Sequence, residues 1–339
     1  MKNSADQWGR RRFLRDAVLA GTAGLVGLHP ERALAEPPPE ITRLKLLEVP
    51  IICGVPQFVA LELLKSEGFT DVQYVPHPTG WNDAIPAGAV DISMLFGPPT
   101  VVQIDAGAPL VVLGGSHIGC VELFGSTRIR TTRDLKGKTI AVSELRGDEH
   151  IFVSMFIAHV GVDPQRDINW LVRPLDVDVR QQLLVERKVD AFMHGPPFSL
   201  ELRERKVGHV LVNTTTDRPW SQYFCCVIAG HKDFVRRHPV ATKRAVRALL
   251  KAADVCALEP ERVARLIMER HLAPRYEYAL QTLREIPYGR WRQYDGEDAL
   301  RFYALRLHEA GLIKSSPQQI LAQGTDWRFF NELKKELKG

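Results

Sequence analysis

The chain has 339 residues, of which 45% are hydrophobic and 25% charged, so it is long enough for two globular domains. Its formal net charge is +5, but residues 1–35 contribute +3 of this through six basic and three acidic side chains. The rest of the chain is nearly neutral, which gives no support to a nucleic acid or an acidic membrane surface as a partner.

The N-terminus has the order of segments that is typical of an export signal. Residues 10–14 read as two arginines, any residue, then Phe-Leu, and an apolar stretch over residues 17–28 is too short to span a bilayer. Ala-Leu-Ala at residues 33–35 supplies a small-x-small cleavage pattern. We therefore predict a twin-arginine signal at residues 1–35, a mature N-terminus at Glu36 and a periplasmic protein. The alternative is an uncleaved N-terminal arm.

After a short proline linker, the first part of the mature chain alternates apolar runs with segments of helical spacing. This βαβα order predicts a parallel sheet with helices on both faces. The expected strands are residues 44–49, 72–75, the run that begins at Val90, and 110–113; the expected helices are residues 57–66, 81–87 and 99–105.

One short pattern occurs twice. Residues 90–99 read Val-Asp-Ile-Ser-Met-Leu-Phe-Gly-Pro-Pro, and residues 189–197 read Val-Asp-Ala-Phe-Met-His-Gly-Pro-Pro. The apolar run is typical of a buried strand, and Gly-Pro-Pro is typical of a sharp exit into a helix. Open α/β sheets bind ligands at such exits, so the repeat predicts two similar lobes whose Gly-Pro-Pro turns face one cleft. The alternative is a chance likeness between two βα units of a single sheet.

A second α/β cycle follows the turn at residues 134–138, and the chain after residue 228 reads as helix only. The second cycle has expected strands at residues 139–142 and 168–172 and expected helices at residues 149–160 and 179–186. We predict a first lobe from residues 36–126 and 223–339 and a second lobe from residues 127–222. The helical tail is expected to pack on the first lobe, and two crossings near residues 122–126 and 222–227 are expected to form the hinge.

The cysteines do not indicate a disulfide framework or a metal site. Their number is odd, their density is low, and no CxxC or Cys/His metal spacing appears. We expect free, buried thiols, no bound metal and no cofactor. The sequence also lacks HExxH, GxSxG, P-loop and dinucleotide-binding motifs, which favours a protein that is not an enzyme. The five cysteines are Cys53, Cys120, Cys225, Cys226 and Cys256.

Several short motifs follow one another along the chain: Ala-Gly-Ala-Val-Asp-Ile (87–92), Gly-Pro-Pro (97–99), Gly-Ala-Pro-Leu (107–110), Asp-Leu-Lys-Gly-Lys-Thr-Ile-Ala-Val (134–142) and Lys-Val-Asp-Ala (188–191). With these motifs in matching order, residues 44–238 resemble the solute-binding proteins of ABC importers for nitrate, sulfonates, taurine and related compounds. Thiamine-pyrimidine precursor proteins belong to the same superfamily. The resemblance implies a type II periplasmic-binding fold, with two α/β lobes of mostly parallel sheets joined by a two-crossing hinge.

The resemblance also implies a function. A monomer would capture a small solute by hinge closure and deliver it to the membrane permease of an ABC transporter, without a nucleic-acid partner. The expected solute is a small anion such as a sulfonate or nitrate, or a small heterocycle. The alternative is an enzyme of the same fold, such as a thiamine-pyrimidine synthase-like protein. Proteins of that branch carry a cysteine-rich run with a phenylalanine, and Phe224-Cys225-Cys226 is similar to only part of that run.

The candidate ligand-binding residues lie in loops at the carboxyl ends of predicted strands or at helix N-termini. Aromatic side chains could wall a planar ligand, and helix N-termini offer free N–H groups to an anion. Arg146 could be an anion clamp or a solvated loop side chain, and Asp148 could be a ligand or an acidic first helical turn. The candidates are Gln57, Phe58, Trp81, Phe96, Gly97, Pro98, Thr100, Ser116, His117, Arg146, Asp148, His150, His194, Gly195, Pro196 and Tyr223.

Overall fold

The computed structural model describes residues 36–49, 51–76, 81–173 and 177–338, and the predicted signal at residues 1–35 lies outside these ranges. Residues from Pro39 onward form one unit, which contains two five-stranded sheets. The first sheet has the order β2-β1-β3-β10-β4 and the second the order β7-β6-β8-β5-β9. The strands of the first sheet are β1 (Arg43–Leu47), β2 (Asp71–Val75), β3 (Ile92–Phe96), β4 (Leu110–Ile118) and β10 (Phe224–His231); those of the second are β5 (Glu122–Gly125), β6 (Thr139–Val142), β7 (Asn169–Val172), β8 (Ala191–His194) and β9 (His209–Asn213).

The two sheets share one topology, and both are mixed. In the first sheet, β1 pairs in parallel with β2 and β3, and β10 pairs antiparallel with β3 and β4. In the second sheet, β6 pairs in parallel with β7 and β8, and β5 pairs antiparallel with β8 and β9. Strands β5 and β10 therefore hold equivalent positions, each as the one antiparallel insert between two strands of its sheet.

The repeated sequence occupies equivalent places, at β3 in the first sheet and β8 in the second. In each copy the aspartate precedes the strand and holds the neighbouring strand through its carboxylate. The Lys45 backbone N–H donates to Asp91 Oδ2 at 2.8 Å, and the Thr139 backbone N–H donates to Asp190 Oδ2 at 3.0 Å. The two copies therefore lie in two different sheets, and the alternative of a chance likeness between two βα units of a single sheet is wrong.

The chain crosses between the sheets twice, after β4 and before β10. Residues 122–125, expected in the first crossing, form β5 of the second sheet, so the crossing itself is confined to residues 119–121. The two crossings run side by side, because the Val121 N–H donates to Thr214 Oγ1 at 3.0 Å and the Thr214 N–H donates to the Val121 carbonyl at 3.0 Å. Each sheet and the helices that cover it form one lobe, the first lobe around the first sheet and the second lobe around the second.

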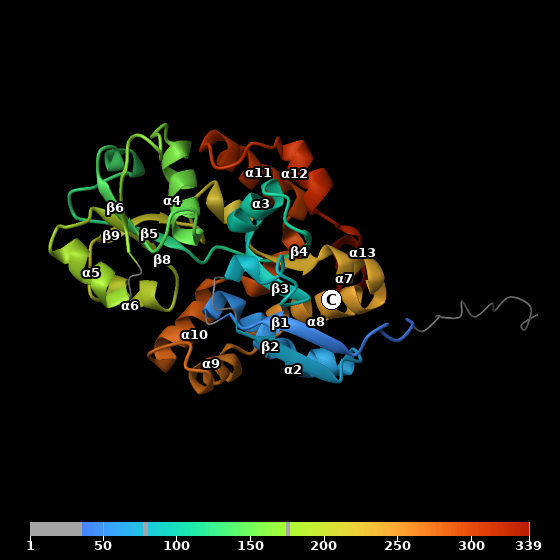
Figure 1. Ribbon diagram of the computed structural model, residues 1–339. Coiled ribbons are helices and arrows are strands. Elements are labelled where there is room, and N and C mark those ends of the chain that lie inside the picture. The colour runs from blue at the N-terminus through green and yellow to red at the C-terminus, as the bar shows by residue number, and fades with distance from the viewer. Residues whose placement is uncertain (1–35, 50, 77–80, 174–176, 339) are drawn as a thin grey trace, which may run out of the picture. The chain divides into compact units, whose positions relative to one another are not determined.

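Helices cover both sheets, and the C-terminal helices belong mainly to the first lobe (Figure 1). Helix α8 packs on α2 and β4, α13 packs on β4 and α8, and α11 and α12 pack on α3. In Figure 1, α4, α5 and α6 surround the second sheet. The helices are α2 (Val55–Ser66), α3 (Gly97–Asp105), α4 (Asp148–His159), α5 (Val177–Val185), α6 (Phe198–Glu204), α7 (Lys232–Arg237), α8 (Pro239–Leu258), α9 (Pro260–Glu269), α10 (Tyr276–Glu285), α11 (Gly296–Glu309), α12 (Pro317–Gly324) and α13 (Arg328–Glu336), with 3-10 turns η1 (Ile52–Gly54), η2 (Trp81–Asp83), η3 (Thr132–Leu135), η4 (Trp220–Gln222) and η5 (Tyr288–Gln293).

Apolar side chains from both lobes contribute to one large core, and a second, smaller apolar cluster lies within the second lobe. Helix α4 of the second lobe carries Phe152 and Phe156, both buried, toward α3 and α11 of the first lobe. Phe152 packs edge-on against Phe96 at 5.5 Å between ring centroids, and Phe156 packs against Trp220 at 4.8 Å. The lobes are therefore joined by apolar packing as well as by the two crossings. None of the described helices is long and apolar enough to cross a membrane.

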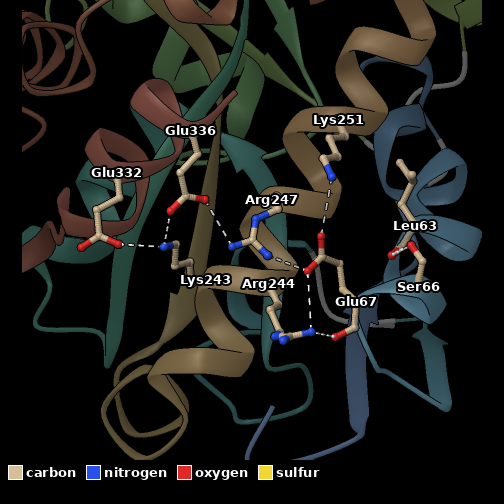
Figure 2. A network of polar contacts seen from close by, with 9 residues as sticks. All are labelled: Leu63, Ser66, Glu67, Lys243, Arg244, Arg247, Lys251, Glu332 and Glu336. Atoms are coloured by element: carbon tan, nitrogen blue, oxygen red, sulfur yellow. Dashed lines mark hydrogen bonds and ion pairs between the residues drawn. The ribbon is translucent and has the colours of Figure 1, made fainter. Parts of the chain in front are cut away.

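A network of charged side chains ties α2, α8 and α13 of the first lobe together (Figure 2). Glu67, which is 9% exposed, accepts from Arg247 Nη1 at Oε2 (2.7 Å), while Arg244 Nη1 donates to the Glu67 carbonyl (2.7 Å). Arg247 Nη2 also donates to Glu336 Oε2 at 3.3 Å. Because the arginines next to Glu67 are themselves largely buried, removing its charge takes away a buried carboxylate partner, while Arg247 keeps its contact with Glu336.

Replacing Glu67 with glutamine is therefore expected to destabilise the protein by about 3 kcal/mol. Urea unfolding followed by circular dichroism measures this as a lower transition midpoint. The control is Glu332→Gln, at a side chain that is 56% exposed and pairs with Lys243 at 3.0 Å, where a change within about 0.5 kcal/mol is expected. Equal midpoints for the two variants would contradict this account of the network.

Candidate functional site

A cavity of about 490 Å³ lies between the two lobes, a size that suits a small metabolite. Its wall combines the carboxyl ends of β1 and β3, the turn after β2, the first crossing, and two segments of the second lobe. Such ends of parallel strands are where α/β sheets place ligands. The lining residues are Ile51, Cys53, Trp81, Asn82, Asp83, Phe96, Gln103, Cys120 and Val121, with residues 143–149 and 193–198 of the second lobe.

Asp148 is the central polar group of the cavity and bridges the two lobes. It is the first residue of α4, and Asn82 Nδ2 of the first lobe donates to its Oδ1 at 2.7 Å. Burial raises the pKa of the Asp148 carboxyl to about 6; the Asn82 hydrogen bond lowers it, and the charge of nearby Glu149 raises it. The carboxylate is consequently ionised at neutral pH and becomes neutral in mildly acidic solution.

A buried ion pair fixes the segment 143–149, which connects β6 to the first turn of α4. Arg180 on α5, with 5% of its side chain exposed, pairs with Glu149 Oε1. The Ser143 N–H donates to Glu149 Oε2 at 2.7 Å, and Arg180 also donates to Ser143 Oγ. Glu149 thus neutralises the charge of Arg180. The Arg180 side chain therefore stabilises the cavity wall but does not offer a positive charge to a ligand.

Carboxylates outnumber basic groups among the described residues of the wall. Asp83, Glu144, Asp148 and Glu149 line the cavity, and Arg180 neutralises one of them, Glu149. The cationic side chain in the same described lining is Arg146, which is exposed. The free N–H groups at the N-terminus of α4 could bind an anion, but the first turn of this helix already carries two carboxylates, which disfavour a further negative charge there. The wall therefore suits a positively charged ligand better than a negatively charged one.

Three aromatic side chains, those of Trp81, Phe96 and Phe198, and one histidine complete the wall. Trp81 and Phe96 are both partly buried and line the cavity from the first lobe. His194, at the end of β8, packs edge-on against Phe198 at 5.3 Å. Burial lowers the pKa of His194, so this ring is neutral at physiological pH. The aromatic faces beside the Asp148 carboxylate form a combination that binds cations attached to planar groups.

The structure brings seven of the sequence-predicted candidates together at this cavity. They are Trp81, Phe96, Arg146, Asp148, His194, Gly195 and Pro196. Of the two Gly-Pro-Pro turns, the second lines the cavity. In the first, a Cβ on Gly97 would point at the Phe224 carbonyl and the Tyr303 ring, both at 3.1 Å, so this turn packs against β10 and α11.

Within the described residues, the other candidates lie outside the cavity wall and have structural contacts. Gln57 Oε1 accepts from Ser93 Oγ and the Met94 N–H, each at 3.0 Å, and Thr100 Oγ1 donates to the Phe96 carbonyl at 2.7 Å. The same holds for Phe58 against Tyr74 and Arg270, Pro98 in the first turn of α3, Ser116 beside Met94, His117 between two carbonyls, His150 on Trp170, and Tyr223 stacked on Phe302.

The sequence-predicted candidates lack several residues of the wall, among them Cys53, Asn82, Cys120 and residues 143–145. The segment 143–145 follows β6 directly, so its position at a strand end was a usable signal. The two cysteines are far apart in the sequence and follow no known spacing, and the fold alone brings them to the floor of the cavity.

Comparison with known proteins supports the architecture. A family model described as the NMT1-like family matches residues 37–269. The structure is similar to that of the periplasmic nitrate-binding protein NrtA from Synechocystis PCC 6803, at 15% identity and TM-score 0.72, covering 89% of this chain and 90% of that one. It is also similar to the alkanesulfonate-binding protein SsuA from Xanthomonas axonopodis pv. citri, bound to MOPS, at 17% identity and TM-score 0.66, covering 85% and 99%.

A third similar structure is a conserved Candida albicans gene product with the generic periplasmic binding protein fold, at 16% identity and TM-score 0.66, covering 84% of this chain and 96% of that one. The comparison with curated proteins finds no match. These likenesses establish a periplasmic-binding fold, in agreement with the expectation from the sequence.

Proposed function

Because the chain belongs to the NMT1-like family, we propose that it is the periplasmic solute-binding component of an ABC importer. Two structurally similar proteins are named as nitrate-binding and alkanesulfonate-binding, and a cavity between two lobes is what such a component needs. The solute would bind as the lobes approach, and the closed protein would dock on the membrane permease.

The solute is a small organic cation, with a protonated nitrogen on or beside a planar ring. The observation that carries this assignment is the partly buried Asp148 carboxylate in a wall that also contains Trp81 and Phe96. Of the two solute classes expected from the sequence, the heterocycle is favoured over the small anion, because the described wall has an excess of carboxylates. A carboxylate and an aromatic face together stabilise a cation that has lost its water.

The Asn82–Asp148 hydrogen bond would form only in the closed arrangement of the lobes, since its donor lies in the first lobe and its acceptor in the second. A solute amine can replace or share the Asn82 amide as the donor to Asp148. The solute would therefore add contacts on both sides of the cavity, which gives it a higher affinity for the closed arrangement than for an open one.

A thermal-shift screen with mass spectrometry tests the proposal. A cationic heterocycle present at 100 times its Kd is expected to stabilise the protein by about 2.7 kcal/mol, and its mass is expected to be unchanged after long incubation. The binding-protein proposal fails if the protein consumes the bound compound, which would indicate an enzyme of the same fold.

Export through the twin-arginine route is a separate proposal, motivated by the sequence of residues 10–14 and 17–28. The double variant Arg10→Lys, Arg11→Lys is expected to remain in the cytoplasm, while the natural chain appears in the periplasm with Glu36 as its first residue. Cell fractionation and N-terminal sequencing measure both. A normal periplasmic yield of the double variant would contradict this route.

A further inference from the structure

Three cysteines from distant parts of the chain meet at the floor of the cavity. Cys53, Cys120 and Cys226 have sulfur atoms that all lie within 4.8 Å of one another. The three side chains are almost fully buried, with 5%, 3% and 4% of their surface exposed. A fourth thiol, that of Cys225, lies 3.0 Å from the Cys120 sulfur but is not one of the mutually close three.

The fold holds each cysteine in place by a different element. Cys53 lies in η1 after β1, Cys226 lies in β10 opposite Phe96 of β3, and Cys120 lies in the first crossing between the lobes. Cys120 has a φ of 129°, a conformation that residues other than glycine rarely adopt. Such strained backbone conformations cluster at functional sites.

The thiols can be reached from the cavity. Cys53 and Cys120 are part of the wall of the large cavity. Cys53 and Cys226 also line a small adjoining cavity of about 10 Å³, which is near the lower limit for one water molecule. Two of the three cysteines therefore belong to the wall of the large cavity, and the third belongs to the wall of the small one beside it.

The donor set determines the kind of ion. Thiolates select soft cations, and the cluster contains no carboxylate that would favour Mg²⁺ or Ca²⁺. For a metal–sulfur distance of about 2.3 Å, planar three-coordination places the sulfurs about 4 Å apart, so only a small inward shift is needed. His117 does not belong to the mutually close set, and its two ring nitrogens lie 3.1 Å from the carbonyls of Cys53 and Ile118.

From this geometry we propose that Cys53, Cys120 and Cys226 bind one soft monovalent cation, Cu(I), in three-coordinate thiolate geometry at the floor of the cavity. The thiol protons leave to solvent as the ion binds, with no change of oxidation state. A set of three mutually close sulfurs matches Cu(I) better than Zn²⁺, which takes four ligands in closed protein sites, because the Cys225 sulfur is close to that of Cys120 but does not belong to this set. The site is independent of the identity of the organic solute.

Anaerobic titration of the reduced mature protein with Cu(I), in competition with the chromophoric chelator bicinchoninate, tests the proposal. One Cu(I) per chain is expected to be withheld from the chelator, and X-ray absorption is expected to show sulfur as the only type of near neighbour. Cys53→Ser, Cys120→Ser and Cys226→Ser should each weaken retention by more than the roughly 10- to 100-fold that loss of an outer-shell partner costs.

Cys256→Ser is the matched control, since Cys256 is equally buried but lies in α8, outside the cluster, and retention should be unchanged. The X-ray absorption measurement needs no variant, so it remains decisive if a serine variant fails to fold. The proposal is overturned if the natural chain releases all Cu(I) to the chelator or if Zn²⁺ displaces Cu(I). It is also overturned if Cys256→Ser weakens Cu(I) retention as much as the three serine variants of the cluster do.

Discussion

Replacing Asp148 with asparagine is expected to weaken solute binding by about 3 kcal/mol, which is roughly a 150-fold rise in Kd. The substitution keeps the shape of the side chain and a partner for Asn82 Nδ2, which now lies 2.7 Å from Asp148 Oδ1. What it removes is the negative charge in a partly dehydrated wall, where a solute cation would gain most from it. Isothermal titration with a cation found in the thermal-shift screen measures the change.

The control for this variant is Glu144→Gln. Glu144 also lines the cavity, but it is exposed to solvent, so its charge is screened and its loss should cost less than about 1 kcal/mol. Equal losses in the two variants would show that overall charge, and not Asp148 itself, governs binding.

The same carboxylate predicts a pH dependence. The pKa of Asp148 is raised to about 6 in the folded protein, so the group is ionised above that pH and protonated below it. Affinity for a quaternary ammonium solute, which does not titrate, should therefore be constant above neutral pH and fall as the pH drops through 6. In Asp148→Asn this decline should be absent.

Replacing Gly119 with alanine is expected to destabilise the protein by about 3 kcal/mol, because steric overlap adds to backbone strain. Gly119 has a φ of +69°, and a Cβ there would lie 2.6 Å from the Cα and 2.3 Å from the Oγ1 of Thr215. Gly119 and Thr215 lie on the two crossings between the lobes, which must then separate. Urea unfolding and the yield of soluble protein measure the effect.

Gly137→Ala separates strain from overlap. Gly137 has a φ of +73°, but nothing lies within 4 Å of a Cβ built there, so only the strain of about 1 kcal/mol is expected. If Gly119→Ala were no more destabilising than Gly137→Ala, the close packing of the two crossings would not matter for stability.

Much of the fold could be predicted because its signals are local. The helical spacing of residues 57–66 and 149–160 corresponds to α2 (Val55–Ser66) and α4 (Asp148–His159), each within two residues. The expected helix at residues 81–87 is only the 3-10 turn Trp81–Asp83. Pro86 and Gly88 follow closely and disfavour a longer helix at this place.

The site was less predictable, because the sequence places a residue at a strand or helix end without telling which way its side chain points. Gln57 and His117 lie next to predicted ligand-facing turns, yet both are directed into the first lobe, where they bind backbone carbonyls or N–H groups. Local patterns also could not set the sign of the cavity charge. Arg146 and Asp148 each had two interpretations, and only the fold shows that Asp148 faces Asn82 across the lobes.

The excess of carboxylates distinguishes this cavity from what the names of its structural neighbours would suggest. Those proteins are named for nitrate and alkanesulfonate, which are anions, but their identity to this chain is 15% and 17%. At that distance the fold is shared while the wall residues are free to differ, so the local charge is a better guide to the solute than the neighbour.

Calorimetric titration of the mature protein with ring-matched pairs of compounds tests the central claim most directly. Each pair shares one planar ring, which carries a protonated aminomethyl group in one member and a methanesulfonate group in the other. We predict that an amine binds with one site per chain, that its affinity falls in Asp148→Asn, and that its sulfonate counterpart does not bind. Binding of the sulfonate at one site per chain, with an affinity unchanged by Asp148→Asn, would contradict the assignment of this cavity to a cationic solute.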